Sequence, residues 1–256
     1  PPNECPECKT ESSLVACGPG VERLAEEIEV LIPDIRMTIA DSDNIQSPGA
    51  ASELVTRIEN HEIDLIIGTQ IIAKGYHFPL LTLVGVIDAD LGLQGGDPRA
   101  AERTFQLLYQ VAGRAGREER PGRVMLQTYM PMHPVMKALL SGDKDQFIDN
   151  EINARREAMM PPFGRLVALI VSGPMETNVD FAAQALAKSA PRGPNITVLG
   201  PAPAPIAILR GRHRRRLLFK ATKETAVQPL IRQWISRAVK YNKVRIQIDV
   251  DPMSFF

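Results

Sequence analysis

The chain has 256 residues, of which 44% are hydrophobic and 23% charged, and its formal net charge at pH 7 is zero. This composition is ordinary for a soluble globular protein with one or two cores, and no apolar stretch reaches the length of about 18 residues that a membrane span needs. Three cysteines favour a reducing compartment over a disulfide framework, so we expect a cytoplasmic protein.

The zero net charge hides a division of the chain. Residues 1–160 contain 15 Lys plus Arg against 25 Asp plus Glu, which leaves a net charge of −10. Residues 161–256 contain 15 against 5, which leaves +10. This asymmetry predicts two domains, of which the basic one faces a polyanion. A basic surface that only meets solvent is the alternative.

Strands and helices alternate in the expected order of the first domain. Apolar runs predict strands at 14–17, 36–40, 65–68, 81–88 and 122–129. Helices are predicted at 21–31, at 50–59, from Asp97-Pro98 onward and at 143–159, because apolar residues recur there with helical spacing or a capping residue opens the segment. Segment 81–88 is nearly all apolar, as expected of a strand buried on both faces. The order predicts an α/β domain with a parallel sheet.

A double-arginine segment follows the helix that opens at Asp97. It is Gln110-Val-Ala-Gly113-Arg114-Ala-Gly-Arg117, with two guanidinium groups three residues apart. Guanidinium is planar and always charged, so the pair could neutralise charge on a transferring phosphoryl group. A solvated, Arg-rich helix end is the alternative. No Gly-Lys dipeptide supplies a phosphate-binding loop and no Asp-Glu pair supplies a magnesium ligand. We therefore expect another domain to bind most of the nucleotide.

Polar residues follow two of the predicted strands, where α/β sheets gather their ligands. Thr69 and Gln70 come after the strand at 65–68, with Lys74 close behind, and Asp88-Ala-Asp90 follows the next strand. Hydroxyl, amide and ammonium groups can hold nucleic-acid phosphates without reading sequence. Thr69 as a simple helix cap is the alternative.

The second domain has the predicted order β-α-β-β-α-β, which is that of a ferredoxin-like unit. The strands are expected at 165–172, from 197, at 206–209, at 217–221 and at 244–250, and the helices at 176–190 and 225–240. Segment 201–205 is expected to be a Pro-rich loop. Trp234 falls on the apolar stripe of its helix and is expected in the core.

A basic hairpin tip is predicted between the strands at 206–209 and 217–221. It carries five arginines: Arg210, Arg212, Arg214, Arg215 and Arg216. These are close enough together to follow a phosphate backbone, and no aromatic residue lies between them for base stacking. The expected binding is sensitive to salt and tolerant of sequence.

These motifs together resemble a known family. The segments 68–75, 78–79, 83–90 and 110–117 resemble motifs V and VI of superfamily 2 helicases, and Asp97-Pro-Arg-Ala-Ala-Glu-Arg103 with Cys5-Pro-Glu-Cys8 narrows the resemblance to the PriA family (primosomal protein N′). It runs the whole length and covers the second half of that protein. The expected domains are the end of a zinc-binding insertion (1–12), a RecA-like second helicase lobe (13–160) and a DNA-binding domain similar to ribosomal protein S10 (161–256).

The resemblance implies a role for each matching residue. ATP with Mg²⁺ would lie between two RecA-like lobes, with Arg114 and Arg117 reaching it from this one and with Gln110, Gly113 and Asp90 nearby. Thr69, Gln70 and Lys74 match the segment that links nucleotide state to the translocating strand. Tyr76-His77 replaces the His-Asp often found before Phe-Pro in the family, so an Asp contact to the ribose is in doubt.

The resemblance also implies a metal and partners. Cys5 and Cys8 match a cysteine pair of the family's zinc region, but structural zinc takes four ligands, so we expect this chain to hold zinc weakly or not at all. The implied function is an ATP-dependent 3′ to 5′ DNA helicase that restarts stalled forks and initiates primosome assembly. Its expected partners are forked and single-stranded DNA, single-stranded DNA-binding protein and primosome proteins.

The isolated chain is expected to behave differently from the whole protein. It opens on Pro1 rather than Met, so we expect a piece of a longer protein. Lacking a phosphate loop, it should bind DNA without hydrolysing ATP. The alternative function is a non-catalytic scaffold module that recognises branched or single-stranded DNA.

Overall fold

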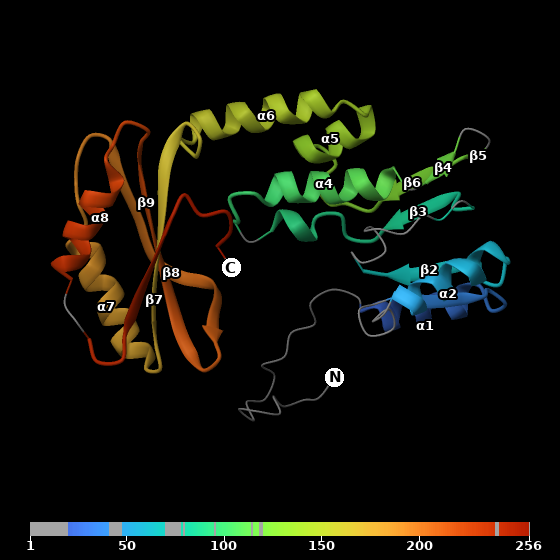
Figure 1. Ribbon diagram of the computed structural model, residues 1–256, viewed down its shortest axis with the longest axis horizontal. Helices are drawn as coiled ribbons and strands as arrows, with labels where there is room; N and C mark the ends of the chain where they lie inside the picture. The colour runs from blue at the N-terminus through green and yellow to red at the C-terminus, as the bar shows by residue number, and fades with distance from the viewer. Residues whose placement is uncertain are drawn as a thin grey trace. The chain divides into compact units, whose positions relative to one another are not determined.

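The structure is a computed structural model that describes residues 20–40, 48–69, 78, 80–94, 96–113, 115–117, 120–238 and 241–255 (Figure 1). Its contacts divide the chain into two compact units. The first comprises Pro1–Ile87 and Gln106–Gln127, and the second comprises Asp88–Phe105 and Thr128–Phe256. Residues 88–105 and 128–160 thus group with the C-terminal region, whereas the sequence predicted one boundary at residue 160.

The first unit contains two parallel strand pairs. β1 (Met37–Ala40) pairs with β2 (Leu65–Gly68), accompanied by α1 (Val21–Leu31) and α2 (Pro48–Glu59). An ion pair fixes the entry to both strands, because Arg36 Nε donates to Asp64 Oδ2 at 2.7 Å. The same bond lowers the pKa of Asp64 below its ordinary value. These elements match the predicted ones within two residues.

The second pair corrects an expectation. β3 (Leu83–Val86) pairs with β6 (Arg123–Leu126), and β4 (Gly116–Arg117) forms a short antiparallel hairpin with β5 (Arg120–Pro121). The prediction that segment 81–88 is buried on both faces is wrong, since Leu83 is 53% exposed and exposed residues alternate along β3 and β6. The described strands of this unit form separate two-stranded sheets. A parallel strand is buried on both faces only where helices cover both faces, and the exposed residues of β3 show that they do not do so here.

Helices begin the second unit. They are η1 (Leu91–Leu93), the start of α4 (Ala100–Ala112), α5 (Pro134–Ser141) and α6 (Lys144–Glu157). α6 matches the predicted helix because Asp143 caps it, accepting a hydrogen bond from the Gln146 N–H at 2.9 Å. α5 was not predicted. No helix among the described residues has both the length and the apolar character to cross a membrane.

A four-stranded antiparallel sheet forms the rest of the second unit. Its elements are β7 (Gly164–Gly173), α7 (Glu176–Lys188), β8 (Ile196–Leu209), β9 (Arg212–Thr222), α8 (Val227–Ser236) and β10 (Arg245–Val250). The spatial order is β10-β7-β9-β8, and every neighbouring pair is antiparallel. The chain is therefore a mixed α/β protein, and the order β-α-β-β-α-β is the one expected from the sequence.

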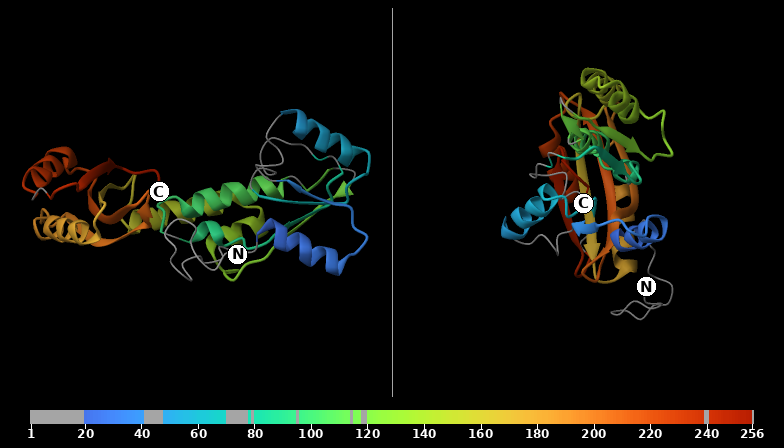
Figure 2. Two further views of the ribbon diagram at one scale, coloured as in Figure 1. Left: turned by 90° about the horizontal axis from the view of Figure 1, so that it is seen from below. Right: turned by 90° about the vertical axis from the view of Figure 1, so that its right-hand side faces the viewer.

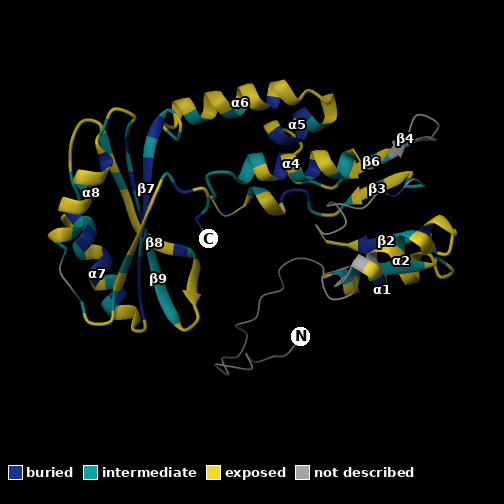
Figure 3. Ribbon diagram, in the orientation of Figure 1, coloured by how far each residue is buried: buried dark blue, intermediate teal, exposed yellow. Residues whose placement is uncertain are grey.

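The main core lies between this sheet and its two helices. α7 and α8 pack on one face, and the residues they bury include Val171, Phe219 and Leu186 (Figures 1, 2 and 3). Trp234 is 2% exposed and its Nε1 donates to the Leu186 carbonyl at 2.9 Å. The prediction that Trp234 belongs to the core is confirmed.

Two predictions about the hairpin are wrong. Segment 201–205 is part of β8 rather than a loop, with register shifts at Leu199/Ala202 and Pro203/Ile208. Proline fits there because β8 is an edge strand, where a missing N–H costs no sheet hydrogen bond. The turn consists of Arg210 and Gly211, both with positive φ, and the other four arginines lie inside β9.

A substitution at Gly164 would test the close packing at the start of β7. A Cβ there would lie 2.9 Å from the Ala221 carbonyl oxygen and closer still to that of Met159, both backbone atoms that cannot rotate away. We expect Gly164→Ala to lower the free energy of unfolding by about 2 kcal/mol, measured by urea denaturation. Gly193→Ala is the control, because its nearest atom would be 3.6 Å away. Equal stabilities of the two variants would contradict this packing.

Candidate nucleic-acid interface

The C-terminal sheet presents one face to α7 and α8 and the opposite face away from them. Side chains of a strand alternate between the two faces. On β7, Val167, Leu169 and Val171 belong to the helix-side core, whereas Leu166 and Ala168 belong to a separate cluster with Phe255. We call the side without helices the open face.

Arg215 lies on the helix side. Its guanidinium is paired with two carboxylates of α7: Nη2 lies 2.7 Å from Glu176 Oε1 and Nε lies 2.6 Å from Asp180 Oδ1. The hydrogen bond to Glu176 raises the pKa of Arg215, and the same bond lowers the pKa of Glu176. With a side chain 14% exposed and two partners, Arg215 has a structural role within the domain.

Arg212, Arg214 and Arg216 alternate onto the open face. Arg216 lies over the Phe255 ring, with its guanidinium carbon 4.3 Å from the ring centroid. Burial lowers the pKa of Arg216. Arg212 Nη2 donates to the carbonyls of Ser172 and Lys243, and Arg214 Nη1 donates weakly to that of Ile206 at 3.4 Å. Carbonyls are neutral, and within the described part of the chain no carboxylate forms an ion pair with Arg212 or Arg214.

A fourth arginine extends this surface across the sheet. Ser172 of β7 pairs with both Arg214 of β9 and Arg245 of β10, so all three share one row. Arg245 is exposed, and so is Arg210 at the turn. We call Arg210, Arg212, Arg214 and Arg245 the basic end of the sheet. Arg212 and Arg214 are half-buried. Guanidinium groups gathered in this way can bind phosphate oxygens in pairs.

The structure thus divides the five predicted arginines. Arg210, Arg212 and Arg214 lie at the basic end, Arg216 is covered by an aromatic ring, and Arg215 lies on the other face. Sequence reasoning missed Arg245, although its place in an alternating strand opposite β7 is a signal that could have found it. Their role in binding nucleic acid stays a prediction.

The residues predicted to act on ATP, to contact the translocating strand or to bind zinc are described only in part. Gln110 is exposed in the last turn of α4, Gly113 follows this helix, and Arg117 belongs to β4. Thr69 is exposed after β2. The others lie outside the described residues: Cys5, Cys8, Gln70, Lys74 and Arg114.

Asp90 has a different environment from the predicted one. Its side chain is buried, and its oxygens accept hydrogen bonds from Thr128 Oγ1 and the Tyr129 N–H, both at 2.6 Å. The carboxylate therefore joins the segment after β3 to the segment after β6. This geometry gives Asp90 a structural role, and its place near a nucleotide stays a prediction.

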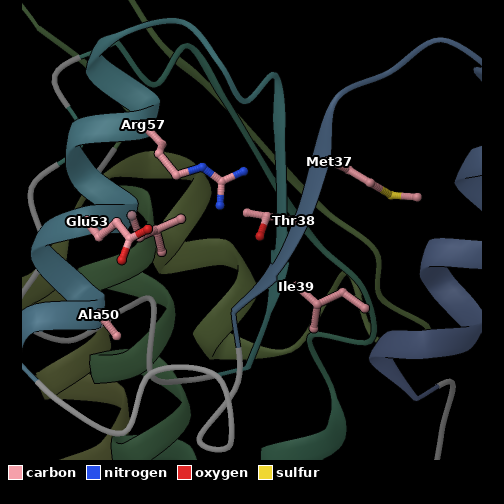
Figure 4. A pocket seen from close by; sticks show the side chains of 7 residues that line it. Met37, Thr38, Ile39, Ala50, Glu53 and Arg57 are labelled. Carbon is pink, nitrogen blue, oxygen red and sulfur yellow. The ribbon is translucent and has the colours of Figure 1, made fainter.

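One cavity of about 490 Å³ lies between β1 and α2 in the first unit. Figure 4 shows Arg57 and Glu53 of α2 directed toward Thr38 of β1. None of the predicted site residues lines it. In the described parts of the chain, no group of three or more His, Cys, Asp or Glu side chains is placed to hold a metal ion.

Comparison with known proteins bears on this interface. Residues 156–253 match the family described as Primosomal protein N C-terminal domain. Proteins called "Replication restart protein PriA" are similar along almost the whole chain: that of Rickettsia conorii is 44% identical over 99% of the chain, and that of Bacillus subtilis is 37% identical over 98%. The matched region spans 39% and 32% of those two proteins. The resemblance found in the sequence is confirmed.

The ion pairs of Arg215 predict a stability effect without a binding effect. Arg215→Ala removes the guanidinium that pairs with Glu176 and Asp180, so the free energy of unfolding should fall at pH 7. Arg214→Ala is the control on the open face and should change it by less than about 0.5 kcal/mol. Similar losses from both variants would contradict the assignment of faces.

The same pair predicts a pH dependence. Because the pKa of Glu176 is lowered from 4.5, its contribution to stability is complete above that value and is lost as the pH falls through the lowered pKa. The difference in unfolding free energy between Arg215→Ala and the unmodified chain should therefore shrink as the pH falls through the lowered pKa of Glu176. A difference that grows on acidification would exclude this ion pair as its source.

Proposed function

We propose that this chain, a homologue of replication restart protein PriA over 99% of its length, provides the DNA-binding domain and second helicase lobe of a replication-restart helicase. The chain spans 39% of the length of the Rickettsia relative, so the activity of the whole protein rests on parts beyond this sequence. The observation that carries the proposal is the basic end of the sheet. There the exposed Arg210 and Arg245 lie with the half-buried Arg212 and Arg214, and none of the four forms an ion pair among the described residues.

DNA binding is assigned to the second unit. The order β10-β7-β9-β8 supports a ferredoxin-like domain, with helices on one side and a face left for a ligand on the other. Contacts from arginine to phosphate depend on backbone charge rather than on base identity, so binding is tolerant of sequence. Forked and single-stranded DNA are the proposed substrates.

ATP hydrolysis is assigned to a site shared with a first lobe. Gln110 lies in the last turn of α4, which places the double-arginine segment directly after a helix end. Arg114 and Arg117 neutralise charge on the γ-phosphate of ATP bound with Mg²⁺, while Gln110 and Gly113 lie beside it. Thr69, Gln70 and Lys74 contact the translocating strand. The parallel pairs β1–β2 and β3–β6 support a RecA-like lobe.

The remaining assignments follow from the family. Movement along DNA is proposed to run 3′ to 5′ and to serve the restart of stalled forks in the cytoplasm, with single-stranded DNA-binding protein and primosome proteins as partners. Cys5 and Cys8 are proposed to complete a zinc site with cysteines from another part of the whole protein. A non-catalytic scaffold that recognises branched DNA is the second candidate, favoured for the isolated chain by its lack of a phosphate loop.

The DNA-binding proposal predicts a loss of affinity on one face. Replacing Arg210, Arg212 and Arg214 by Ala should weaken binding to a fluorescent single-stranded oligonucleotide by about tenfold or more at low salt. It should also reduce the slope of log affinity against log salt by roughly 2. Replacing Arg192, Arg232 and Arg237, which are exposed elsewhere in the domain, removes the same charge and serves as control. Equal effects would indicate non-specific attraction alone.

The shared catalytic site predicts an inactive chain. DNA-stimulated ATP hydrolysis should be absent from the isolated chain and should appear when the first lobe is supplied, since the phosphate loop lies there. In the protein with both lobes, Arg114→Ala or Arg117→Ala should lower the rate by about 10³-fold, with Arg123→Ala on exposed β6 as control. Hydrolysis by the isolated chain would favour a complete site within it.

A further inference from the structure

The motif Asp97-Pro-Arg-Ala-Ala-Glu-Arg103 is part of the resemblance to the PriA family, but none of its residues has a role in the proposed function. In the structure it meets the C-terminal segment 251–255, which we call the C-terminal strap. Ser254 Oγ donates to Asp97 Oδ2 at 2.8 Å, and Arg103 Nη2 donates to the Met253 carbonyl at 3.0 Å. The motif at the start of α4 thus serves as the receptor for the strap.

Asp97 is the centre of this contact. Its side chain is 5% exposed, and burial by itself would raise its pKa. The pKa is nevertheless lowered, because the backbone N–H of Arg99, the Ser254 hydroxyl, the Arg103 cation and the backbone N–H of Phe255 all favour the charged form. A buried carboxylate with this many partners depends on the strap for its stability.

The strap is also fastened to the C-terminal sheet. The N–H of Asp251 donates to the Leu166 carbonyl at 2.6 Å, and the N–H of Leu166 donates to Asp251 Oδ1 at 3.0 Å. Phe255 packs on Leu166 and Ala168 of the open face. Five residues therefore connect the open face of the sheet to the start of α4.

A second connection reaches the same turn without the strap. Arg155 of α6 lies 2.6 Å from Glu102 and donates to the carbonyls of Pro98 and Pro161 at 2.8 and 3.0 Å. Pro161 lies three residues before β7, which begins at Gly164. Because this bond set does not involve the strap, the start of α4 remains attached to the unit when the strap moves.

Among the residues that contact the strap, Arg216 is the one that could bind an anion. It covers the Phe255 ring, and its Nη1 atom is buried with no hydrogen-bond partner among the described residues. An unmet buried donor is unfavourable, and a phosphate oxygen would satisfy it. Arg214, at the basic end of the sheet, is two residues away on the same face.

We propose that Arg216 senses nucleic-acid phosphate bound at the basic end of the sheet and, by turning toward it, uncovers Phe255 and loosens the C-terminal strap from the start of α4. This rests on the proposed DNA binding. α4 runs on to Ala112, immediately before Gly113 and Arg114 in the chain. Release of the strap removes the Ser254 hydroxyl and the Met253 carbonyl as hydrogen-bond partners of Asp97 and Arg103 at the start of this helix.

Hydrogen exchange of the whole chain tests this proposal. With a saturating single-stranded oligonucleotide, the amides of residues 253–255 should exchange about tenfold faster than in the free protein. In Arg216→Ala the oligonucleotide should still bind through the basic end, but the exchange of residues 253–255 should no longer respond to it. Binding without faster exchange in the unmodified chain, or an unchanged response in the variant, would overturn the proposal.

A second arm separates failure of the strap from failure of DNA binding. Asp97→Asn should speed exchange at residues 253–255 in the absence of any nucleic acid, whereas Asp149→Asn, on an exposed position of α6, should not. If the oligonucleotide fails to bind, both the proposed DNA binding and the sensing role of Arg216 are refuted. If Asp97→Asn leaves exchange unchanged, the strap itself is refuted whatever the DNA result.

Discussion

The two-residue alternation of β9 is the constraint on which the functional surface depends. β9 pairs with β7 without interruption from His213 to Thr222, so successive side chains go to opposite faces of the sheet. Arg215 must therefore face α7, where Glu176 and Asp180 neutralise it, while Arg214 must face away. A one-residue shift in register would exchange their partners and would also place Phe219 outside the core.

Elements with a local signal were predicted well from the sequence. Asp143 caps α6, apolar residues recur at helical spacing in α7 and α8, and apolar and polar residues alternate in β10. The order of helices and strands along the C-terminal part of the chain therefore followed from short-range patterns. The family resemblance came from residue types in sequence and needed no fold. Predictions that depended on distant partners failed: the exposure of β3 depends on its neighbours, and the edge position of β8 is what admits its prolines.

The candidate site shows the same division. The sequence identified the basic run, but the faces, the neutralising carboxylates of α7 and the row shared with Arg245 depend on pairing between strands. Asp90 was predicted beside a nucleotide from its place after a strand, yet its bonds to Thr128 and Tyr129 come from a segment 38 and 39 residues away. The link from Asp97 to Ser254 spans 157 residues and had no local signal.

The central claim is that one face of the C-terminal sheet, and not the whole basic run, meets DNA. The most direct test follows the arginine Nε–H signals by nuclear magnetic resonance while single-stranded DNA is added to the chain. The account predicts that the signals of Arg210, Arg212, Arg214 and Arg245 shift together, while that of Arg215 stays in place because its Nε is bonded to Asp180. A shift of Arg215 as large as that of Arg214 would contradict the account.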